Sequence, residues 1–376
     1  MKKKVLRIAT VPMSLNLLLQ GQLRMLNEEY EMVAVASPGK DLEEVGEREG
    51  IRTVEIRMER RISPIQDLKS LFALIKLIRK EKPWMVHTMN PKAGLLGMLA
   101  AWICGVPVRF HLFTGLVFPT SKGLKRKLLM TTDKLTCACA TFINPEGEGV
   151  KRDLERFGIT HKELHIVGNG NINGIDMTYF DRTEEVMKKA ESIREKDSIT
   201  FCFVGRIVGD KGMNELAEAF ARLEKEFPSC RLLLVGDFEE KLDPVSPETK
   251  RMFLENSRVT FAGWQQDIRP YLAASDIFVF PSYREGFPNV VLQAGAMGLP
   301  SIVTDINGSS EIIRDGVNGV IIPPRDMEAL WKAMRNMLTD EAARRKMAAN
   351  ARNLIGSRYD RTFLWQELKK TYKSLE

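Results

Sequence analysis

Several features that assign chains to common classes are missing from this sequence. No apolar run approaches the roughly 20 residues of a membrane span, and the longest, Leu95–Val106, is interrupted by Gly97 and Gly105. Neither half opens with Gly-x-Gly-x-x-Gly after its first apolar segment, which argues against a nicotinamide-dependent oxidoreductase. No Asp-x-Asp motif occurs in a turn where it could hold a metal ion on a diphosphate. We therefore expect neither a membrane span nor a bound metal.

Cysteine is scarce, with five residues in 376. All five fall inside apolar segments, and their spacing matches no set of metal ligands; they are Cys104, Cys137, Cys139, Cys202 and Cys230. This usage predicts reduced cysteines in the core of a cytoplasmic protein.

Positive charge is unevenly distributed along the chain. Residues 1–180 hold 27 Lys and Arg against 19 Asp and Glu, whereas the remaining residues hold 29 against 30. The excess lies in clusters such as Arg57/Arg60/Arg61, Lys76/Arg79/Lys80/Lys82 and Lys122/Lys125/Arg126/Lys127. A basic face of this kind attracts an anionic membrane surface or lipid phosphates, although an ordinary solvated surface has the same composition. No nucleic-acid-binding module accompanies the charge, so nucleic acid is not an expected partner.

Short apolar strands alternate with amphipathic helices in both halves, which predicts parallel sheets covered on both faces. The strands expected in the first half are Val5–Val11, Glu31–Ala36, Thr53–Ile56, Met85–Met89, Val108–Thr114, Thr141–Asn144 and Leu164–Gly168. Those expected in the second half are Ile199–Gly205, Arg231–Gly236, Val259–Gly263, Ile277–Pro281, Ser301–Thr304 and Val320–Ile322.

The chain is also too long for one ordinary core, and an Asn- and Gly-rich stretch followed by a charged one, residues 169–197, separates the two arrays. We predict an α/β fold of two Rossmann-like domains that face each other across a cleft. The expected domains are residues 1–180 and 181–358, and an amphipathic helix in residues 359–376 is expected to pack back on the first domain.

The most informative stretch is Arg284-Glu285-Gly286-Phe287-Pro288-Asn289, between the strand Ile277–Pro281 and the helical stretch Val290–Met297. This order predicts a strand that delivers a carboxylate into a Gly-Phe-Pro turn, from which a helix begins at once. Unpaired backbone N–H groups at a helix start suit a phosphate, and the carboxylate can accept hydrogen bonds from sugar hydroxyls. Two cations, Arg206 and Lys211, lie in a second strand-to-helix turn. Together the two turns predict a site for a sugar esterified to a diphosphate.

Six segments, in this order and spacing, resemble a known family. They are 87–94 (His-Thr-Met-Asn-Pro-Lys-Ala-Gly), Thr114-Gly115-Leu116, Gly168–Asp176, Gly205–Gly212, Pro281–Gly298 and Asp305–Gly319. Over essentially its whole length the chain resembles the retaining GT-B glycosyltransferases of family four, which include bacterial capsule, O-antigen and lipid-linked glycan transferases. The resemblance implies transfer of a hexose or N-acetylhexosamine from a nucleotide sugar, most simply a UDP-sugar, to a polyprenyl-diphosphate-linked glycan. The first domain would face the acceptor and the membrane, and the second would hold the donor.

At the donor, the resemblance implies catalytic roles for Glu285, on the sugar hydroxyls, and for Arg206 and Lys211, on the diphosphate. Charge accumulates on the leaving nucleoside diphosphate, so these cations should act most strongly in the transition state. The family's second glutamate is replaced by Gln293, whose amide can still contact the ribose. The other expected donor contacts are Gly286, Phe287, Pro288, Asn289, Gly263, Trp264 and Glu311.

On the first domain, the resemblance implies that His87 is a catalytic residue in contact with the transferred sugar or the acceptor. A buried structural histidine is the alternative. The expected acceptor contacts are Lys92, Thr114, Gly115 and Ser14, the last within Met13–Asn16, which we expect to form the first strand-to-helix turn. No metal and no cofactor is implied, because the nucleotide sugar is a second substrate.

Two other functions are compatible with these residues. A nucleotide-sugar epimerase or hydrolase shares the two-domain architecture, and Gln293 is compatible with a non-catalytic partner subunit that binds sugar nucleotides. The basic first half and the turn at Glu285 favour transfer. We expect a cytoplasmic protein, peripheral at the inner leaflet of the cell membrane.

Overall fold

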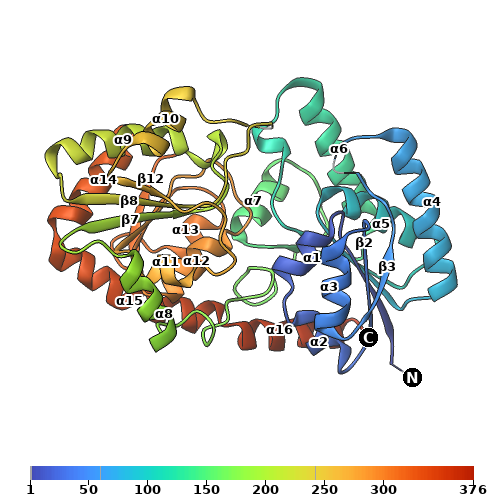
Figure 1. Cartoon of the computed structure of the whole chain (residues 1–376). Helices are drawn as coiled ribbons and strands as arrows, with labels where there is room; N and C mark the ends of the chain where they lie inside the picture. Colours follow the sequence, from blue (N-terminus) through green and yellow to red (C-terminus); the bar gives the residue numbers. More distant parts are fainter. Residues whose placement is uncertain (1, 60, 242) are drawn as a thin grey trace. The chain divides into compact units, whose positions relative to one another are not determined.

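The computed structural model describes residues 2–59, 61–241 and 243–376, so Arg60 of the first basic cluster lies outside the described residues. The chain divides into two compact units. The first comprises the chain up to Gly174 together with Thr362–Glu376, and the second comprises Ile175–Arg361. Each unit is built on a six-stranded sheet with helices on its faces (Figure 1). The predicted α/β fold with two Rossmann-like domains is confirmed.

The sheet of the first unit has the strand order β3-β2-β1-β4-β5-β6, and every pair is parallel. Its strands are β1 Lys4–Ile8, β2 Glu31–Ala36, β3 Arg52–Glu55, β4 Met85–Met89, β5 Val108–Phe113 and β6 Phe142–Pro145. The order reverses between β1 and β4, and ligands of such sheets bind outside the carboxyl ends of the strands at this switch point. The predicted strand Leu164–Gly168 is wrong: Leu164 forms an isolated bridge to Ile143, and the backbone then turns at Gly168, where φ is +58°.

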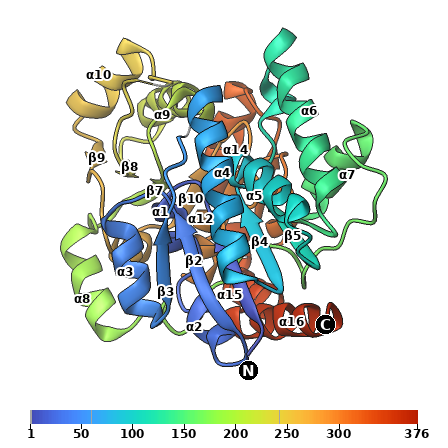
Figure 2. The ribbon, with the colours of Figure 1, turned by 90° about the vertical axis from the view of Figure 1, so that its right-hand side faces the viewer.

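Helices cover both faces of this sheet (Figure 2). On one face α4, α5 and α6 pack in a row over Leu6, Ile8 and Val86. On the other face, Val5 and Met85 share a core with residues of α1, α2, α3 and α16. Because side chains alternate along a strand, Arg7 and His87 point to the α16 side. The helices are α1 Pro12–Leu18, α2 Gln22–Asn27, α3 Lys40–Glu49, α4 Pro64–Glu81, α5 Pro91–Ile103, η1 Phe118–Thr120, α6 Gly123–Cys139, α7 Glu148–Arg156 and α16 Arg361–Ser374.

The second unit has the same plan, with the parallel strand order β12-β11-β10-β7-β8-β9. Its strands are β7 Ile199–Val204, β8 Cys230–Val235, β9 Val259–Phe261, β10 Ile277–Phe280, β11 Ser301–Thr304 and β12 Gly319–Ile322. The order reverses between β7 and β10, so the switch point of this unit lies there.

The helices of the second unit also lie on both faces, with α9 and α14 on one side of the sheet and α12 and α15 on the other (Figure 1). Its helices are α8 Glu184–Ile193, η2 Gly209–Lys211, α9 Met213–Glu226, α10 Pro247–Glu255, α11 Arg269–Ala273, α12 Asn289–Ala296, α13 Ser309–Ile312, α14 Met327–Thr339 and α15 Glu341–Tyr359. Within the described parts of both units, no helix has both the length and the hydropathy that crossing a bilayer requires.

Candidate functional site

The loops that follow β7 and β10 touch at the switch point of the second unit. The N–H group of Tyr283, in the β10 loop, donates to the carbonyl oxygen of Asp210, in the β7 loop, at 2.8 Å. Gly212 makes this approach possible. Its φ is +70°, and a Cβ atom there would lie 2.1 Å from the carbonyl oxygen of Pro281. A residue with a side chain would therefore push the two loops apart.

Lys211 and Glu285 form an ion pair across this contact. Their side chains are 15% and 17% exposed. The Lys211 ammonium also lies 5.2 Å from the centre of the Phe280 ring. The structure thus brings together the cation predicted for a diphosphate and the carboxylate predicted for a sugar.

Three residues that the sequence did not single out hold the Glu285 loop in place. The fully buried Ser282 donates from Oγ to Glu285 Oε1 at 2.7 Å, and the Thr304 hydroxyl at the end of β11 donates to the Ser282 carbonyl oxygen. Asp210 pairs with Arg284 at 2.8 Å. A hydroxyl residue shortly after an apolar strand and three positions before Glu285 is the signal that could have identified Ser282.

The turn at 286–288 is anchored from both sides. The Phe287 side chain is buried and meets the Tyr359 ring edge-on, at 5.4 Å between ring centres. Gly308, with a φ of +75°, packs so closely that a Cβ atom there would lie 2.5 Å from the Gly286 carbonyl oxygen. The side chain of Phe287 therefore packs in the core, and the backbone of the turn is the part that can face a ligand. Pro288 is the N-cap residue of α12 and supplies no side-chain hydrogen bond to it. The turn lies at the positive end of that helix dipole.

The other predicted donor residues follow neighbouring strands of the same sheet edge. Arg206, after β7, is exposed and paired with Glu239, so it is not part of the Lys211–Glu285 cluster. Trp264 and the preceding Gly263 follow β9, and the indole is 67% exposed while its backbone N–H donates to Asp237 at 3.0 Å. Glu311, on α13, accepts from the Gly308 N–H at 3.1 Å. Asn289 begins α12, and the half-buried Gln293 lies one turn further along that helix.

In the first unit, the predicted acceptor residues follow three adjacent strands, β1, β4 and β5. Lys92 lies at the start of α5 and pairs with Asp67 of α4 at 2.6 Å. Thr114 and Gly115 follow β5 and are half-buried. Ser14 follows β1, but the predicted turn Met13–Asn16 is wrong because α1 already begins at Pro12. Proline suits a first helical position, since its fixed φ is helical and its missing N–H would have no partner there.

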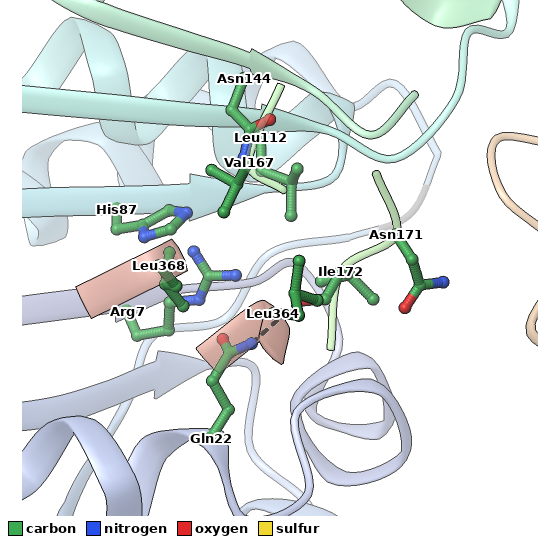
Figure 3. A pocket seen from close by; sticks show the side chains of 10 residues that line it. All are labelled: Arg7, Gln22, His87, Leu112, Asn144, Val167, Asn171, Ile172, Leu364 and Leu368. Atoms are coloured by element: carbon green, nitrogen blue, oxygen red, sulfur yellow. Dashed lines mark hydrogen bonds between the residues drawn. The ribbon is translucent and has the colours of Figure 1, made fainter. Parts of the chain in front are cut away.

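His87 lies in the middle of β4, before the carboxyl end of that strand, and is buried. Its Nδ1 atom is 2.6 Å from the Tyr372 hydroxyl, and its ring stacks on Phe110 at 3.9 Å. Burial, with the positive charge of Arg7 as a second cause, holds the pKa of His87 well below its usual value. The ring is therefore neutral. It packs on the side of the sheet that α16 covers, and Figure 3 shows it near Arg7 and Leu368. Contact of His87 with a substrate stays a prediction.

A stability test follows from the Gly212 contact. Gly212→Ala should lower the free energy of unfolding, because an alanine at this φ raises the free energy of the folded state by about 1–3 kcal/mol. It should also weaken the binding of UDP, because the added Cβ atom displaces the Pro281 carbonyl and with it the loop that follows β10. Chemical denaturation and calorimetric titration with UDP measure the two effects. Gly316→Ala is the matched control, since Gly316 has the same φ of +70° but open space around its Cβ position. It should lose stability from strain and keep UDP affinity; equal effects of both variants on UDP affinity would contradict the role of the loop contact.

Two family models match this chain. The one described as glycosyl transferases group 1 matches residues 184–354, and the one described as a glycosyl transferase 4-like domain matches residues 19–170. Together they cover most of both units.

Known relatives match over long stretches. The capsular polysaccharide biosynthesis glycosyltransferase CapM of Staphylococcus aureus is 30% identical over 99% of this chain and 97% of that protein. The Escherichia coli UDP-Gal:alpha-D-GlcNAc-diphosphoundecaprenol alpha-1,3-galactosyltransferase is 32% identical over 79% of this chain and 76% of that protein. The solved structure of Anabaena Alr3699/HepE in complex with UDP has a similar fold, with a TM-score of 0.82 at 19% identity over the full length of both chains. Because these matches include a relative 30% identical along almost the entire length, the chain belongs to the GT-B glycosyltransferases of family four.

Proposed function

We propose that this glycosyltransferase moves a hexose or N-acetylhexosamine from a UDP-sugar to a polyprenyl-diphosphate-linked glycan, with retention of the anomeric configuration. The observation that carries the proposal is the Lys211–Glu285 pair at the switch point between β7 and β10. Lys211 is the cation that we propose for the diphosphate, and Glu285 is the carboxylate that we propose for the sugar. The UDP-Gal donor and diphosphoundecaprenol acceptor in the name of the Escherichia coli relative, and the UDP in the Anabaena structure, support the choice of substrates.

In the proposed mechanism, Lys211 exchanges Glu285 for the donor diphosphate, and Arg206 reorients from Glu239 as the second cation. The bond between the sugar C1 and the diphosphate oxygen breaks, and the two cations neutralise the charge that develops on the leaving group. The acceptor hydroxyl attacks from the same face, and a phosphate oxygen of the departing diphosphate takes its proton. Lys and Arg supply the positive charge in this scheme, so no metal ion and no cofactor is needed.

The remaining donor residues have positioning roles in this proposal. Glu285, held by Ser282, accepts hydrogen bonds from the sugar hydroxyls. The backbone of residues 286–289 and the start of α12 meet the phosphates, and Gln293 meets the ribose. Trp264, Gly263 and Glu311 lie along the same sheet edge. Ser14, Lys92, Thr114 and Gly115 of the first unit are proposed for the acceptor.

The exposed face of α4 suits an anionic membrane, which we propose as the docking partner of the first unit. Ile65, Leu68 and Phe72 lie one turn apart and are 75%, 53% and 62% exposed. The same face continues with basic residues, namely Lys69, Lys76, Arg79 and Lys80. Apolar side chains that enter the interface, next to cations that attract lipid headgroups, are the features of a helix that lies on a bilayer. Docking at the inner leaflet would bring the enzyme to a lipid-linked acceptor.

Charge reversal on α4 tests this docking. The double variant Lys76→Glu/Lys80→Glu should bind vesicles with anionic lipid at least about tenfold more weakly, since each cation near the surface contributes about 1 kcal/mol. Co-sedimentation with phosphatidylglycerol vesicles measures the change, and wild-type binding should weaken with added salt. The control Lys188→Glu/Lys225→Glu makes the same charge change at exposed positions of the second unit and should leave binding unchanged. Salt-independent binding, or equal losses in both variants, would refute the docking face.

The proposed reaction is tested with a panel of UDP- and GDP-sugars, each with and without a polyprenyl-diphosphate glycan and with and without a chelator. Transfer should require the lipid-linked acceptor and proceed equally with chelator, and the product's anomeric proton coupling should show retention. Conversion or hydrolysis of the sugar nucleotide without acceptor would instead identify an epimerase or hydrolase. Binding without turnover for every pair would identify a non-catalytic subunit.

A further inference from the structure

A small cavity lies inside the first unit, between its sheet and α16 (Figure 3). Its volume is about 10 Å³, the scale at which a protein cavity holds one water-sized group. Arg7 on β1 and His87 on β4 are paired in the sheet register and both line it, and Leu364 and Leu368 of α16 lie on the opposite side. All the lining residues are buried. All the residues that line the cavity belong to the first unit, whereas the residues proposed for the donor belong to the second.

Arg7 carries a buried charge inside this cavity. Its residue is 1% exposed, and within the described part of the chain its Nε and Nη1 atoms have no hydrogen-bond partner. Burial lowers the pKa of Arg7 to about 10, which still leaves the guanidinium protonated at neutral pH. Figure 3 shows this group directed into the cavity.

Among the described residues, no carboxylate acts on the charge of Arg7. The described residues that line the cavity include neither Asp nor Glu. A deprotonated Tyr372 would act on Arg7 as a negative charge. Burial raises the pKa of the Tyr372 phenol to about 12, however, so the phenol stays neutral. A buried and uncompensated charge is strongly unfavourable, so the site favours an anion.

The His87 ring is the second polar group of the cavity. The Tyr372 phenol keeps its proton, and among the described residues its one hydrogen-bond partner is His87 Nδ1. We therefore assign the hydroxyl as the donor, which places the proton of the neutral ring on Nε2. Nε2 has no partner among the described residues. Both unpartnered groups are then hydrogen-bond donors. The cavity therefore offers donors and positive charge to a single acceptor.

We propose that this cavity binds one small monovalent anion, chloride under ordinary conditions, held by the Arg7 guanidinium and the His87 N–H. A phosphate or carboxylate ligand is too large for a space that holds one water-sized group. A water molecule would satisfy the donors but would leave the charge of Arg7 uncompensated, whereas a halide does both. Because Tyr372, Leu364 and Leu368 belong to α16, the bound anion stabilises the packing of the C-terminal helix on the sheet. This inference does not depend on which sugar or acceptor the enzyme uses.

Thermal unfolding of the full chain tests the anion site, with sodium chloride exchanged for sodium gluconate at constant ionic strength. Gluconate screens surface charges equally but is too large to enter. The unfolding midpoint should rise with chloride by about 2 °C for each tenfold increase above the dissociation constant, and bromide should act in the same way. Arg7→Met should abolish this dependence, whereas Arg152→Met, at an exposed position of α7, should retain it.

A diffraction measurement keeps the proposal testable if Arg7→Met does not fold. Wild-type crystals grown in sodium bromide should show an anomalous peak in the cavity, within hydrogen-bond distance of Arg7. A wild-type midpoint that is equal in chloride and gluconate would overturn the proposal. So would a cavity without an anomalous peak, which would indicate water in place of the anion.

Discussion

Lys211→Ala should lower turnover by about 100-fold or more while the protein stays folded. Lys211 forms an ion pair with Glu285, the carboxylate proposed to bind the sugar. Removing one preorganised group that stabilises transition-state charge costs about 10²–10³ in rate. The affinity for UDP should fall as well, because the diphosphate loses a positively charged partner. Steady-state kinetics with the donor and acceptor identified by the panel, and calorimetric titration with UDP, measure the two effects.

Lys189→Ala is the matched control for this variant. Lys189 also forms an ion pair with a glutamate, Glu185, at 2.7 Å, but on the exposed surface of α8. Its removal should change neither turnover nor UDP affinity. Turnover of Lys211→Ala within about threefold of the wild type would remove Lys211 from the proposed mechanism.

The fold could be predicted to a large extent because its strands are buried on both faces. β7 and β10 consist almost entirely of buried apolar residues, a pattern that is typical of parallel strands between two helical layers. One error occurred where a short apolar segment pairs too little to form a strand. Leu164–Gly168 has the composition of a strand, but its pairing is limited to one bridge, and such partners are set by tertiary packing rather than by local pattern.

The candidate site was predictable where it depends on the chain order of strand, turn and helix. Lys211 and Glu285 both follow strands that border the switch point, so the topology brings them together. Of the residues that support Glu285, Ser282 lies three positions before it and could have been identified from that spacing. Thr304 could not, because it lies on another strand, 22 positions from the Ser282 carbonyl oxygen that accepts its hydrogen bond. The packing of His87 under Tyr372 joins residues 285 positions apart, a separation that no local pattern reveals.

Glu285→Ala should lower turnover by about 100-fold or more, as is expected for Lys211→Ala. Unlike Lys211→Ala, it should not lower the affinity for UDP. The sugar hydroxyls lose their carboxylate acceptor, so the chemical step slows. UDP has no sugar to contact Glu285, and Lys211 no longer has a carboxylate partner that competes with the diphosphate. UDP affinity should therefore be equal to that of the wild type or higher. Kinetics and calorimetric titration on both single variants separate the two roles.

Two further variants show whether position as well as charge matters at Glu285. Ser282→Ala keeps the carboxylate but removes the 2.7 Å hydrogen bond that orients it, so turnover should fall by about tenfold, the equivalent of one net hydrogen bond of about 1.4 kcal/mol. Glu185→Ala, the exposed partner of Lys189, should leave turnover unchanged. If Glu285→Ala instead lost UDP affinity together with turnover, the carboxylate would be supporting the loop rather than binding the sugar, and the division of roles between Lys211 and Glu285 would be wrong.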